Sequence, residues 1–512
     1  MQSRLLKNIL SVSGVLILVK ALGFFKQMVI AGIFGANAET DLINLSYGFI
    51  GDIQYLLVQV MLTAVVSVYI HVKEETQNEA GQFASDTLCA GTIVVAAISA
   101  TIFMLSPWIS KLLAPSYSQE LSSQLGGYIR LFSPILIPLV WMAVFHALLN
   151  SNKRFIPGQL EGLYQSVILV IVIILGAPYL GVDSLVIGYW LYATFSAGFL
   201  GYQARTYLRK SSRNPFRNPQ VRSLLAMVGP LSIGYGAVYI NQMVDKILVS
   251  GLADGTVTAM SYAATLSNLV GTLICSLCSV LYAHVTEYIS QEKEQAVAQL
   301  TERAILVLVI LLLPVTVIAV SQAEDIVLLI YGRGAFDAEA AAMTAQALMG
   351  YSLSFIPLAL REVYSRVQYG YQDSKHPAVN SVIGIACNVT LSILLCRKFG
   401  VFGVTLASSV ATLVIGMLNV QSARRTASFL SLKSLWNLTP NILIGGILSI
   451  LLQQEKVTAP YLAEKFEVSR RPLLIRLCLT TFFVFSGYSV LVIPAVWKTG
   501  LIKPCHFSRK QR

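Results

Sequence analysis

Apolar runs of about twenty residues recur along the 512-residue chain and are separated by short polar gaps. A run of that length lets an α-helix cross the hydrocarbon core of a bilayer, which is about 30 Å thick. Hydrophobic residues make up 55% of the chain and charged residues 12%, whereas soluble domains carry roughly 25% charged residues. The sequence therefore predicts an all-α polytopic membrane protein with about fourteen transmembrane helices.

The basic residues mark one side of the membrane. They gather before the first apolar run (Arg4, Lys7), in segment 205–222 and in the tail 500–512, which the positive-inside rule places in the cytoplasm. One basic segment, 453–472, does not follow this rule, because it lies between the last two predicted spans and would be external. The formal net charge of +12 is spread over alternate loops and forms no nucleic-acid-binding face. We expect a multi-pass protein of the cytoplasmic (inner) membrane with both termini cytoplasmic and membrane lipids as neighbours.

An internal repeat is visible at an offset of about 215 to 220 residues. The matching pairs are Lys26-Gln-Met-Val29 with Asn241-Gln-Met-Val244, Ile137-Pro-Leu139 with Ile356-Pro-Leu358, and Pro157 with Pro377. Several matches in the same order indicate a duplicated unit of roughly six spans. Two such lobes, related by an axis along the membrane normal, are typical of alternating-access transporters. The repeated prolines Pro138 and Pro357 are predicted to bend their helices.

The repeat sets the predicted boundaries. They are residues 1–204 for the first six-helix lobe, 205–222 for a basic cytoplasmic linker, 223–425 for the second, pseudo-symmetric lobe, 434–499 for an appended C-terminal helix pair and 500–512 for a basic cytoplasmic tail.

Lys20 and Lys26 lie within the first apolar run, on either side of Gly23. An ammonium group at bilayer depth costs at least about 2.5 to 3.5 kcal/mol, so it persists where it faces a protein interior or a wet cavity. The alternative is that both side chains extend to the membrane surface. Because Lys26 lies far from either end of the run, we favour a role inside the protein.

Several motifs carry a family resemblance. They are Ala21-Leu-Gly-Phe24, Ile33-Phe-Gly-Ala36, Tyr331-Gly-Arg-Gly-Ala-Phe336 and Gln372-Asp-Ser-Lys-His-Pro377. In these residues and their order the chain resembles the lipid II flippase family MurJ (MviN), within the superfamily of multidrug, oligosaccharidyl-lipid and polysaccharide exporters. The resemblance implies a flippase that moves an undecaprenyl-diphosphate-linked saccharide, lipid II first, to the outer leaflet.

The resemblance also implies site residues. Two cavity arginines of the family fall on Lys20 and Lys26, and an acidic residue after the first turn falls on Asp41. Two other family arginines fall on Gln54 and Thr265, which carry no charge. These departures leave open an exopolysaccharide or O-antigen intermediate as the lipid-linked substrate.

In the second lobe, Arg361 is the predicted diphosphate contact. Glu362 and Arg366 are four residues apart on one helix and are expected to pair with each other, which leaves Arg361 for the substrate. The alternative for Arg361 is a salt bridge to an acid such as Asp52. We expect Asp41, Asp52, Gln54 and Glu362 to gate or support the cavity.

A coupling ion is a further hypothesis. Asp245 could bind a monovalent cation together with the oxygens of Asn388 and Ser408, because hard ions prefer oxygen ligands. A buried structural ion pair of Asp245 is the alternative, although its neighbour Lys246 points about 100° away around the helix and does not simply neutralise it. Transport would then be driven by that cation or by the membrane potential.

Two other functional classes are weighed against the flippase. An intramembrane enzyme needs a general base or a metal cluster, but the longest polar gaps contain no histidine, paired carboxylates or phosphate-binding glycine motif. We therefore predict no catalytic residue, no metal site and no organic cofactor. A cation-coupled multidrug exporter would have an acidic, aromatic cavity and not a lysine-lined one. The expected partner is a lipid-linked saccharide, bound by a monomer.

Overall fold

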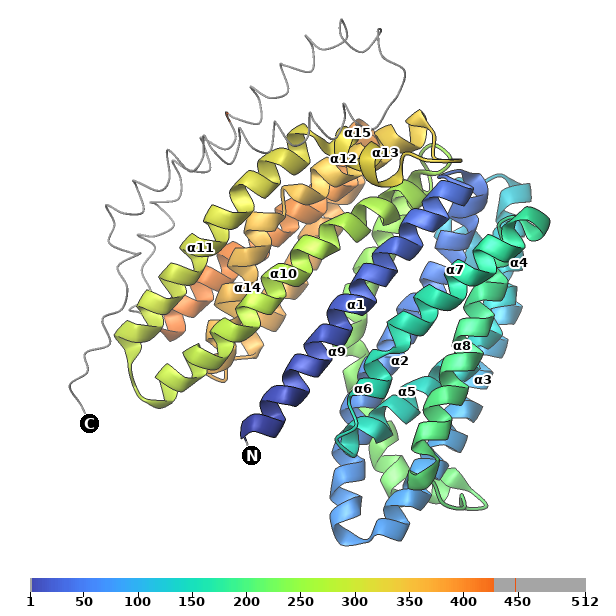
Figure 1. The fold of residues 1–512 in the computed structure, drawn as a ribbon, viewed down its shortest axis with the longest axis vertical. Coiled ribbons are helices and arrows are strands. Elements are labelled where there is room, and N and C mark those ends of the chain that lie inside the picture. The colour runs from blue at the N-terminus through green and yellow to red at the C-terminus, as the bar shows by residue number, and fades with distance from the viewer. Residues whose placement is uncertain (1, 428–446, 448–512) are drawn as a thin grey trace, which may run out of the picture. The chain divides into compact units, whose positions relative to one another are not determined.

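The computed structural model describes residues 2–427 and residue 447, which are helical where they are regular and contain no β-strand (Figure 1). The helices are α1 (Gln2–Phe34), α2 (Ala38–Glu75), α3 (Gln77–Leu113), α4 (Gln119–Phe132), α5 (Leu136–Ser151), α6 (Ile156–Gln159), α7 (Glu161–Leu180), α8 (Asp183–Ala204), α9 (Pro219–Val249), α10 (Thr256–Ser290), α11 (Glu294–Ser321), α12 (Ala323–Tyr331), α13 (Ala338–Ser352), α14 (Phe355–Gly370) and α15 (Lys375–Thr426). The predicted helix pair 434–499 and tail 500–512 lie outside the described residues.

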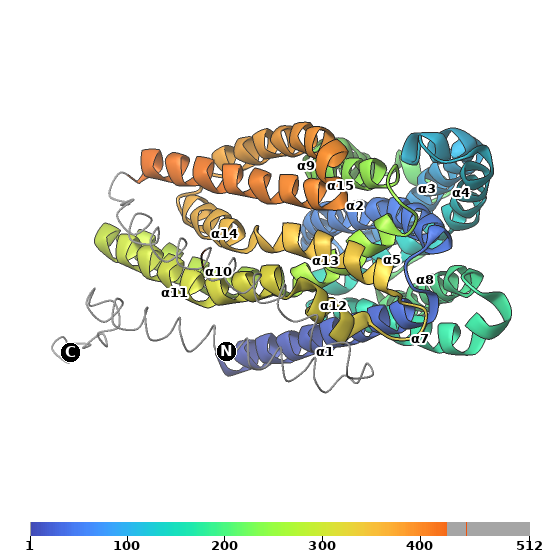
Figure 2. The same cartoon turned by 90° about the horizontal axis from the view of Figure 1, so that it is seen from above.

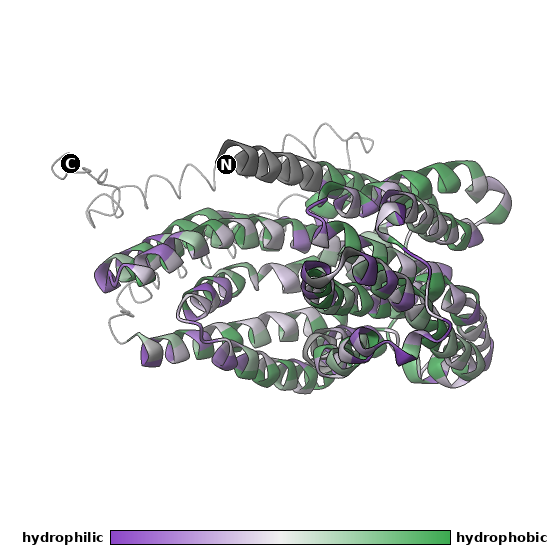
Figure 3. Ribbon diagram, turned by 90° about the horizontal axis from the view of Figure 1, so that it is seen from below, coloured by the Kyte–Doolittle hydropathy of each residue, from purple (hydrophilic) through white to green (hydrophobic). Residues whose placement is uncertain are grey.

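The long helices have the composition of membrane spans. Within the described residues, nine helical segments are long and apolar enough to cross a bilayer, and Figure 3 shows hydrophobic residues along most of their length with hydrophilic residues concentrated near loops and helix ends. The longest segment, Lys375–Arg425, consists of two helices, because the backbone of Gly400 breaks the helical geometry. The all-α membrane architecture is thus confirmed, and the total of fourteen stays a prediction.

The described chain forms two compact units. Of the described residues, those up to 261 and those from 331 to 340 form unit 1, and the others, from 262 to 330 and from 341 onward, form unit 2. These units follow spatial contacts, whereas the predicted lobes follow the repeat, so the lobe boundaries stay a prediction.

In unit 1 the helices pack in sequence around α2 and α5. Helix α1 packs on α7, α7 on α8, α8 on α5, and α5 on α2, and the same neighbours lie side by side in Figures 1 and 2. Large side chains at the centre are fully buried, including Leu42, Ile50, Phe132 and Tyr192. This packing places polar residues of α1, α2, α7 and α8 within reach of each other.

The core of unit 2 is formed by α10, α11, α14 and α15. Buried residues from all four helices make one cluster, among them Ile274, Val309, Val363 and Val420. Helix α14 packs against both α11 and α15, and these helices run along one another in Figure 2. Arg361 and Glu362 are carried by α14 at this core.

The duplication is visible in backbone conformation. Lys153 and Gln372 have positive φ angles of 59° and 61°, and Gln372 follows Lys153 by 219 residues. The same 219 residues separate Gly181 (φ 55°, ψ −136°) from Gly400 (φ 56°, ψ −137°). Because positive φ is uncommon outside glycine, two such matches at one offset support the repeat that the sequence predicts.

Two glycines allow close backbone approach where α1 ends. A Cβ atom on Gly35 would collide with the carbonyl oxygen of Ala335, and one on Gly334 would collide with that of Gly32. The amide of Ala335 donates to the carbonyl of Gly32 (2.9 Å). This hydrogen bond attaches the 331–340 segment to the end of α1 and explains why that segment belongs to unit 1.

The basic linker is attached to α3 by an acid that sequence reasoning missed. Asp86 accepts hydrogen bonds from the Ser211 hydroxyl (2.6 Å), from the Ser212 amide (2.6 Å) and from the Asn218 side chain (2.8 Å). Segment 205–222 therefore lies against α3 within unit 1.

Candidate functional site

Lys26 is partly buried on α1 and is tied to two other helices. Its Nζ donates to Oε1 of Gln165 on α7 (3.4 Å), and Nε2 of Gln165 donates to the hydroxyl of Tyr47 on α2 (3.1 Å). The ring of Tyr47 stacks on that of Tyr189 from α8 at a centroid distance of 3.4 Å. An ammonium group among neutral hydrogen-bonding partners keeps its charge available to an anion.

Lys20 lies six residues earlier on α1 and is exposed. Six residues correspond to about 600° of helical rotation, so the two lysines point roughly 120° apart. The structure therefore does not bring Lys20 and Lys26 together on one face. Within the described residues, Lys20 forms no ion pair or hydrogen bond.

Asp41 caps a helix other than its own. Its carboxylate is 2% exposed and accepts hydrogen bonds from the backbone amides of Gly255 (2.9 Å) and Thr258 (2.8 Å), and from the Thr258 hydroxyl (2.6 Å). Those amides lie at the start of α10, where N–H groups lack partners in the helix and the dipole favours an anion. Asn37 caps α2 locally through Thr40, which leaves Asp41 free for α10.

Asp52 forms an ion pair with Lys246. Its Oδ2 lies 3.0 Å from Nζ of Lys246 on α9, and the two side chains are 15% and 19% exposed. This lysine neutralises Asp52 within unit 1, and the alternative of an Arg361–Asp52 salt bridge stays a prediction. Asp245 is buried beside Lys246 in the sequence, and its own expected ion pair stays a prediction.

Gln54 is bound to an acid that sequence reasoning missed. Its Nε2 donates to Oε1 of Glu161 at the start of α7 (3.0 Å), and the hydroxyl of Tyr192 on α8 donates to the same oxygen (2.7 Å). Gln54 and Tyr192 are 5% and 1% exposed. Glu161 stands at the edge of an apolar run, like Asp183, which is exposed; sequence alone does not separate the two.

On α14, Glu362 forms ion pairs with two arginines. Oε1 of Glu362 lies 2.9 Å from Nη2 of Arg361, and its Oε2 lies 3.5 Å from Nη2 of Arg366. The expectation that Glu362 would pair with Arg366 alone is wrong, because a carboxylate has two oxygens and can accept from both sides. Because Glu362 is shared, the charge of Arg361 is only partly neutralised, and the Arg361 side chain is about one-third exposed.

The residues of the hypothetical cation site lie on separate helices. Asp245 is in α9, whereas Asn388, which is buried, and Ser408 are both in α15. The ion site they would form stays a prediction.

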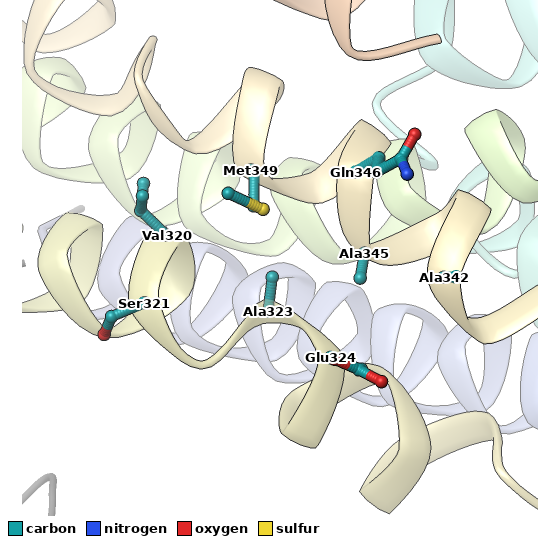
Figure 4. A pocket seen from close by; sticks show the side chains of 8 residues that line it. All are labelled: Val320, Ser321, Ala323, Glu324, Ala342, Ala345, Gln346 and Met349. Atoms are coloured by element: carbon teal, nitrogen blue, oxygen red, sulfur yellow. The ribbon is translucent and has the colours of Figure 1, made fainter. Parts of the chain in front are cut away.

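A cavity of about 180 Å³ lies in unit 2 where α11 ends and α12 begins, against α13 (Figure 4). It is lined by Val320, Ser321, Ala323, Glu324, Ala342, Ala345, Gln346 and Met349. None of these side chains is cationic, so this cavity does not provide a diphosphate site.

Comparisons with known proteins give a consistent result. The family model described as "Lipid II flippase MurJ" matches residues 30–469. A protein of Treponema pallidum named "Probable lipid II flippase MurJ" is 21% identical over 432 residues, which cover 81% of this chain and 80% of that protein. A Synechocystis protein of the same name is 25% identical over 431 residues, covering 79% of each chain.

Solved structures show the same fold. A structure described as "Lipid II flippase MurJ, inward closed conformation" covers 95% of this chain and all of its own, with a TM-score of 0.78 and 18% identity. An inward-facing multidrug transporter of the MATE family covers 80% of this chain and 94% of its own, with a TM-score of 0.68 and 13% identity.

Proposed function

The chain belongs to the lipid II flippase MurJ family, and we propose that it moves an undecaprenyl-diphosphate-linked saccharide, lipid II first, from the inner to the outer leaflet by alternating access. A hydrophilic headgroup cannot cross about 30 Å of hydrocarbon at a useful rate without such a path. The chain acts as a transporter and not as an enzyme.

The observation that carries this proposal is Lys26, an ammonium group on an apolar membrane helix whose hydrogen-bond partner is the neutral Gln165. A diphosphate carries about two negative charges, and a lysine acts on it as a point charge. Lys20 and Arg361 are the other proposed contacts. Arg361 contributes less, because Glu362 already neutralises part of its charge.

Asp41 is the proposed gate. Its hydrogen bonds connect the start of α2 to the start of α10, and they must break for those two helix ends to separate. Asp52 and Gln54 support the same unit through Lys246 and Glu161, and Glu362 orients Arg361. These roles rest on the contacts of each residue.

The proposal also covers the location, orientation, oligomeric state and driving force of the protein. The protein is a multi-pass membrane protein, which we place in the cytoplasmic membrane with both termini in the cytoplasm. It works as a monomer, without a resident cofactor, and is driven by a monovalent cation at Asp245, Asn388 and Ser408 or by the membrane potential.

Gln54 supports a second candidate substrate. It is neutral where the resemblance implies an arginine, and its amide is already bound to Glu161. A site with fewer positive charges also suits an exopolysaccharide or O-antigen intermediate on the same prenyl diphosphate. A multidrug exporter is a weaker alternative, supported only by the shared fold.

The test is rescue of a bacterial strain depleted of its own lipid II flippase. Expression of this chain should restore access of an externally added lipid II-cleaving enzyme to its substrate. Lys26→Ala should abolish rescue at normal membrane levels, and Lys26→Arg should retain it. Lys111→Ala is the matched control, because Lys111 is an exposed lysine at the end of α3. Failure of the unaltered chain despite good membrane levels would remove lipid II as substrate and favour the polysaccharide intermediate.

A further inference from the structure

Glu161 is a carboxylate in a membrane helix, and the proposed mechanism uses it only as the partner of Gln54. Both of its hydrogen bonds, from Gln54 and Tyr192, end on Oε1. Within the described residues, Oε2 accepts no hydrogen bond and no lysine or arginine forms an ion pair with Glu161. A partly buried carboxylate that forms no ion pair is costly to keep ionised.

Glu161 also lies close to the proposed diphosphate contact. Gln165, which holds Lys26, is four residues further along α7 and therefore lies on the same face, about one helical turn away. Glu161 and the Lys26 partner Gln165 therefore share one face of α7, on which Glu161 accepts from Gln54 and Tyr192 and Gln165 donates to Tyr47.

We propose that Glu161 is a proton-binding site coupled to the diphosphate at Lys26. The inference rests on the function proposed above. Glu161 binds a proton on Oε2, taken from water, when the diphosphate binds, and it returns the proton to water when the diphosphate leaves. No other bond is made or broken.

The coupling follows from charge. An ionised Glu161 would repel a diphosphate at Lys26, whereas a protonated Glu161 leaves the full charge of Lys26 to attract it. In the empty protein, an ionised Glu161 balances Lys26, so that the helices can close around a region with no net charge. A proton and an anionic substrate therefore favour each other's binding, and linkage makes this effect reciprocal.

The titration of Glu161 must be distinguished from that of other titratable groups around it. Tyr47 and Tyr55 of α2 and Tyr189 and Tyr192 of α8 face this region, but free tyrosine titrates near pH 10. On α2, Asp52 is held by Lys246.

His146 of α5 is the other side chain that could bind the proton in place of Glu161. Its ring packs on Gly158 in the short helix α6, and neither ring nitrogen has a hydrogen-bond partner in the described part of the chain. Histidine titrates in the same range as a buried carboxylate, so it needs its own variant in the test.

The experiment measures binding of undecaprenyl diphosphate to the purified full-length protein between about pH 6 and pH 8. For the unaltered protein, affinity should fall as pH rises, on the order of tenfold beyond the titration of the diphosphate itself, a typical coupling between two sites. Glu161→Gln should bind tightly at both pH values, because the amide imitates the protonated acid. Calorimetry in two buffers of different ionisation enthalpy should show that the unaltered protein takes up about one proton more on binding than Glu161→Gln does, because the diphosphate and Lys26 titrate in both proteins.

Three further variants make the test specific. Glu161→Asp keeps an ionisable group and should keep a pH dependence. Asp183→Asn is the matched control, because Asp183 also accepts a hydrogen bond from a tyrosine (Tyr128, 2.8 Å) but is exposed. An unchanged pH dependence in Glu161→Gln, or its loss in His146→Gln alone, would overturn the inference and leave the flippase proposal intact. Absence of any binding to the unaltered protein would overturn the diphosphate function and this inference with it.

Discussion

Asp41 and Asp52 show two ways of keeping a carboxylate inside a membrane helix. Asp41 is held by backbone N–H groups at the start of α10, and Asp52 is held by the ammonium group of Lys246. The first arrangement depends on the position of a helix end, and the second on a flexible side chain. Asp41 therefore restrains the packing of its helices more strictly than Asp52 does, because backbone N–H groups cannot move independently as a lysine side chain can.

Replacing Asp41 by alanine should destabilise the protein by at least about 1 to 3 kcal/mol, because buried amide groups of α10 lose their acceptor. Asp41→Asn should have an intermediate effect, since its oxygen still accepts hydrogen bonds but carries no charge. Thermal unfolding of the purified protein measures the difference. Glu39→Ala, two residues away and exposed, is the control and should change stability by less than about 0.5 kcal/mol. Equal stability of Asp41→Ala and Glu39→Ala would contradict the capping role.

At the scale of helices, the repeated prolines mark where spans are interrupted. Pro138 and Pro357 are each the third residue of their helix, α5 and α14. A proline in the first helical turn needs no hydrogen-bond acceptor. The predicted bend within a helix is thus a break before it, between α4 and α5 and between α13 and α14.

Gly181 and Gly400 end helices in a conformation that side chains disfavour. Gly181→Ala should cost about 1 to 3 kcal/mol, although a Cβ there would meet no atom within 4 Å. Gly198 in α8 also has free space around it but has helical geometry, so Gly198→Ala should be neutral or stabilising by up to about 1 kcal/mol. Thermal unfolding compares the two variants directly. If both variants changed the unfolding temperature by the same amount, the positive φ of Gly181 would not be what requires glycine there.

At the scale of the whole molecule, orientation in the membrane is the decisive property. The basic linker is held on α3 through Asp86, so its arginines and lysine stay with one end of unit 1. The turn between α1 and α2 is separated from the start of α1 by a 33-residue helix, which is longer than a bilayer requires. These two regions are therefore good reporters of the two sides.

Single cysteines at Glu39 and Lys210, both exposed, should test the orientation in a background that lacks the seven native cysteines. A membrane-impermeant thiol reagent should label Glu39→Cys in intact cells and Lys210→Cys only after the membrane is opened. The cysteine-free protein must still complement a flippase-depleted strain. Labelling of Lys210→Cys from outside would reverse the proposed topology.

The sequence by itself determined the class of the protein, the repeat and the unusual lysines. These features are contained in windows of about twenty residues or in direct comparison of the two halves, because hydrophobic length and helical periodicity are local. It also predicted the pairing of Glu362 with Arg366, although it missed that Glu362 binds Arg361 as well.

Only the tertiary structure decided which polar groups meet. Asp41 reaches residues 214 to 217 positions away, and Glu161 meets Gln54 across 107 positions. In an apolar helix each polar side chain must find a partner or remain costly, but the choice of partner depends on how the helices pack. No local pattern distinguishes the enclosed Glu161 from the exposed Asp183, since both stand at the start of an apolar run and only the neighbouring helices differ.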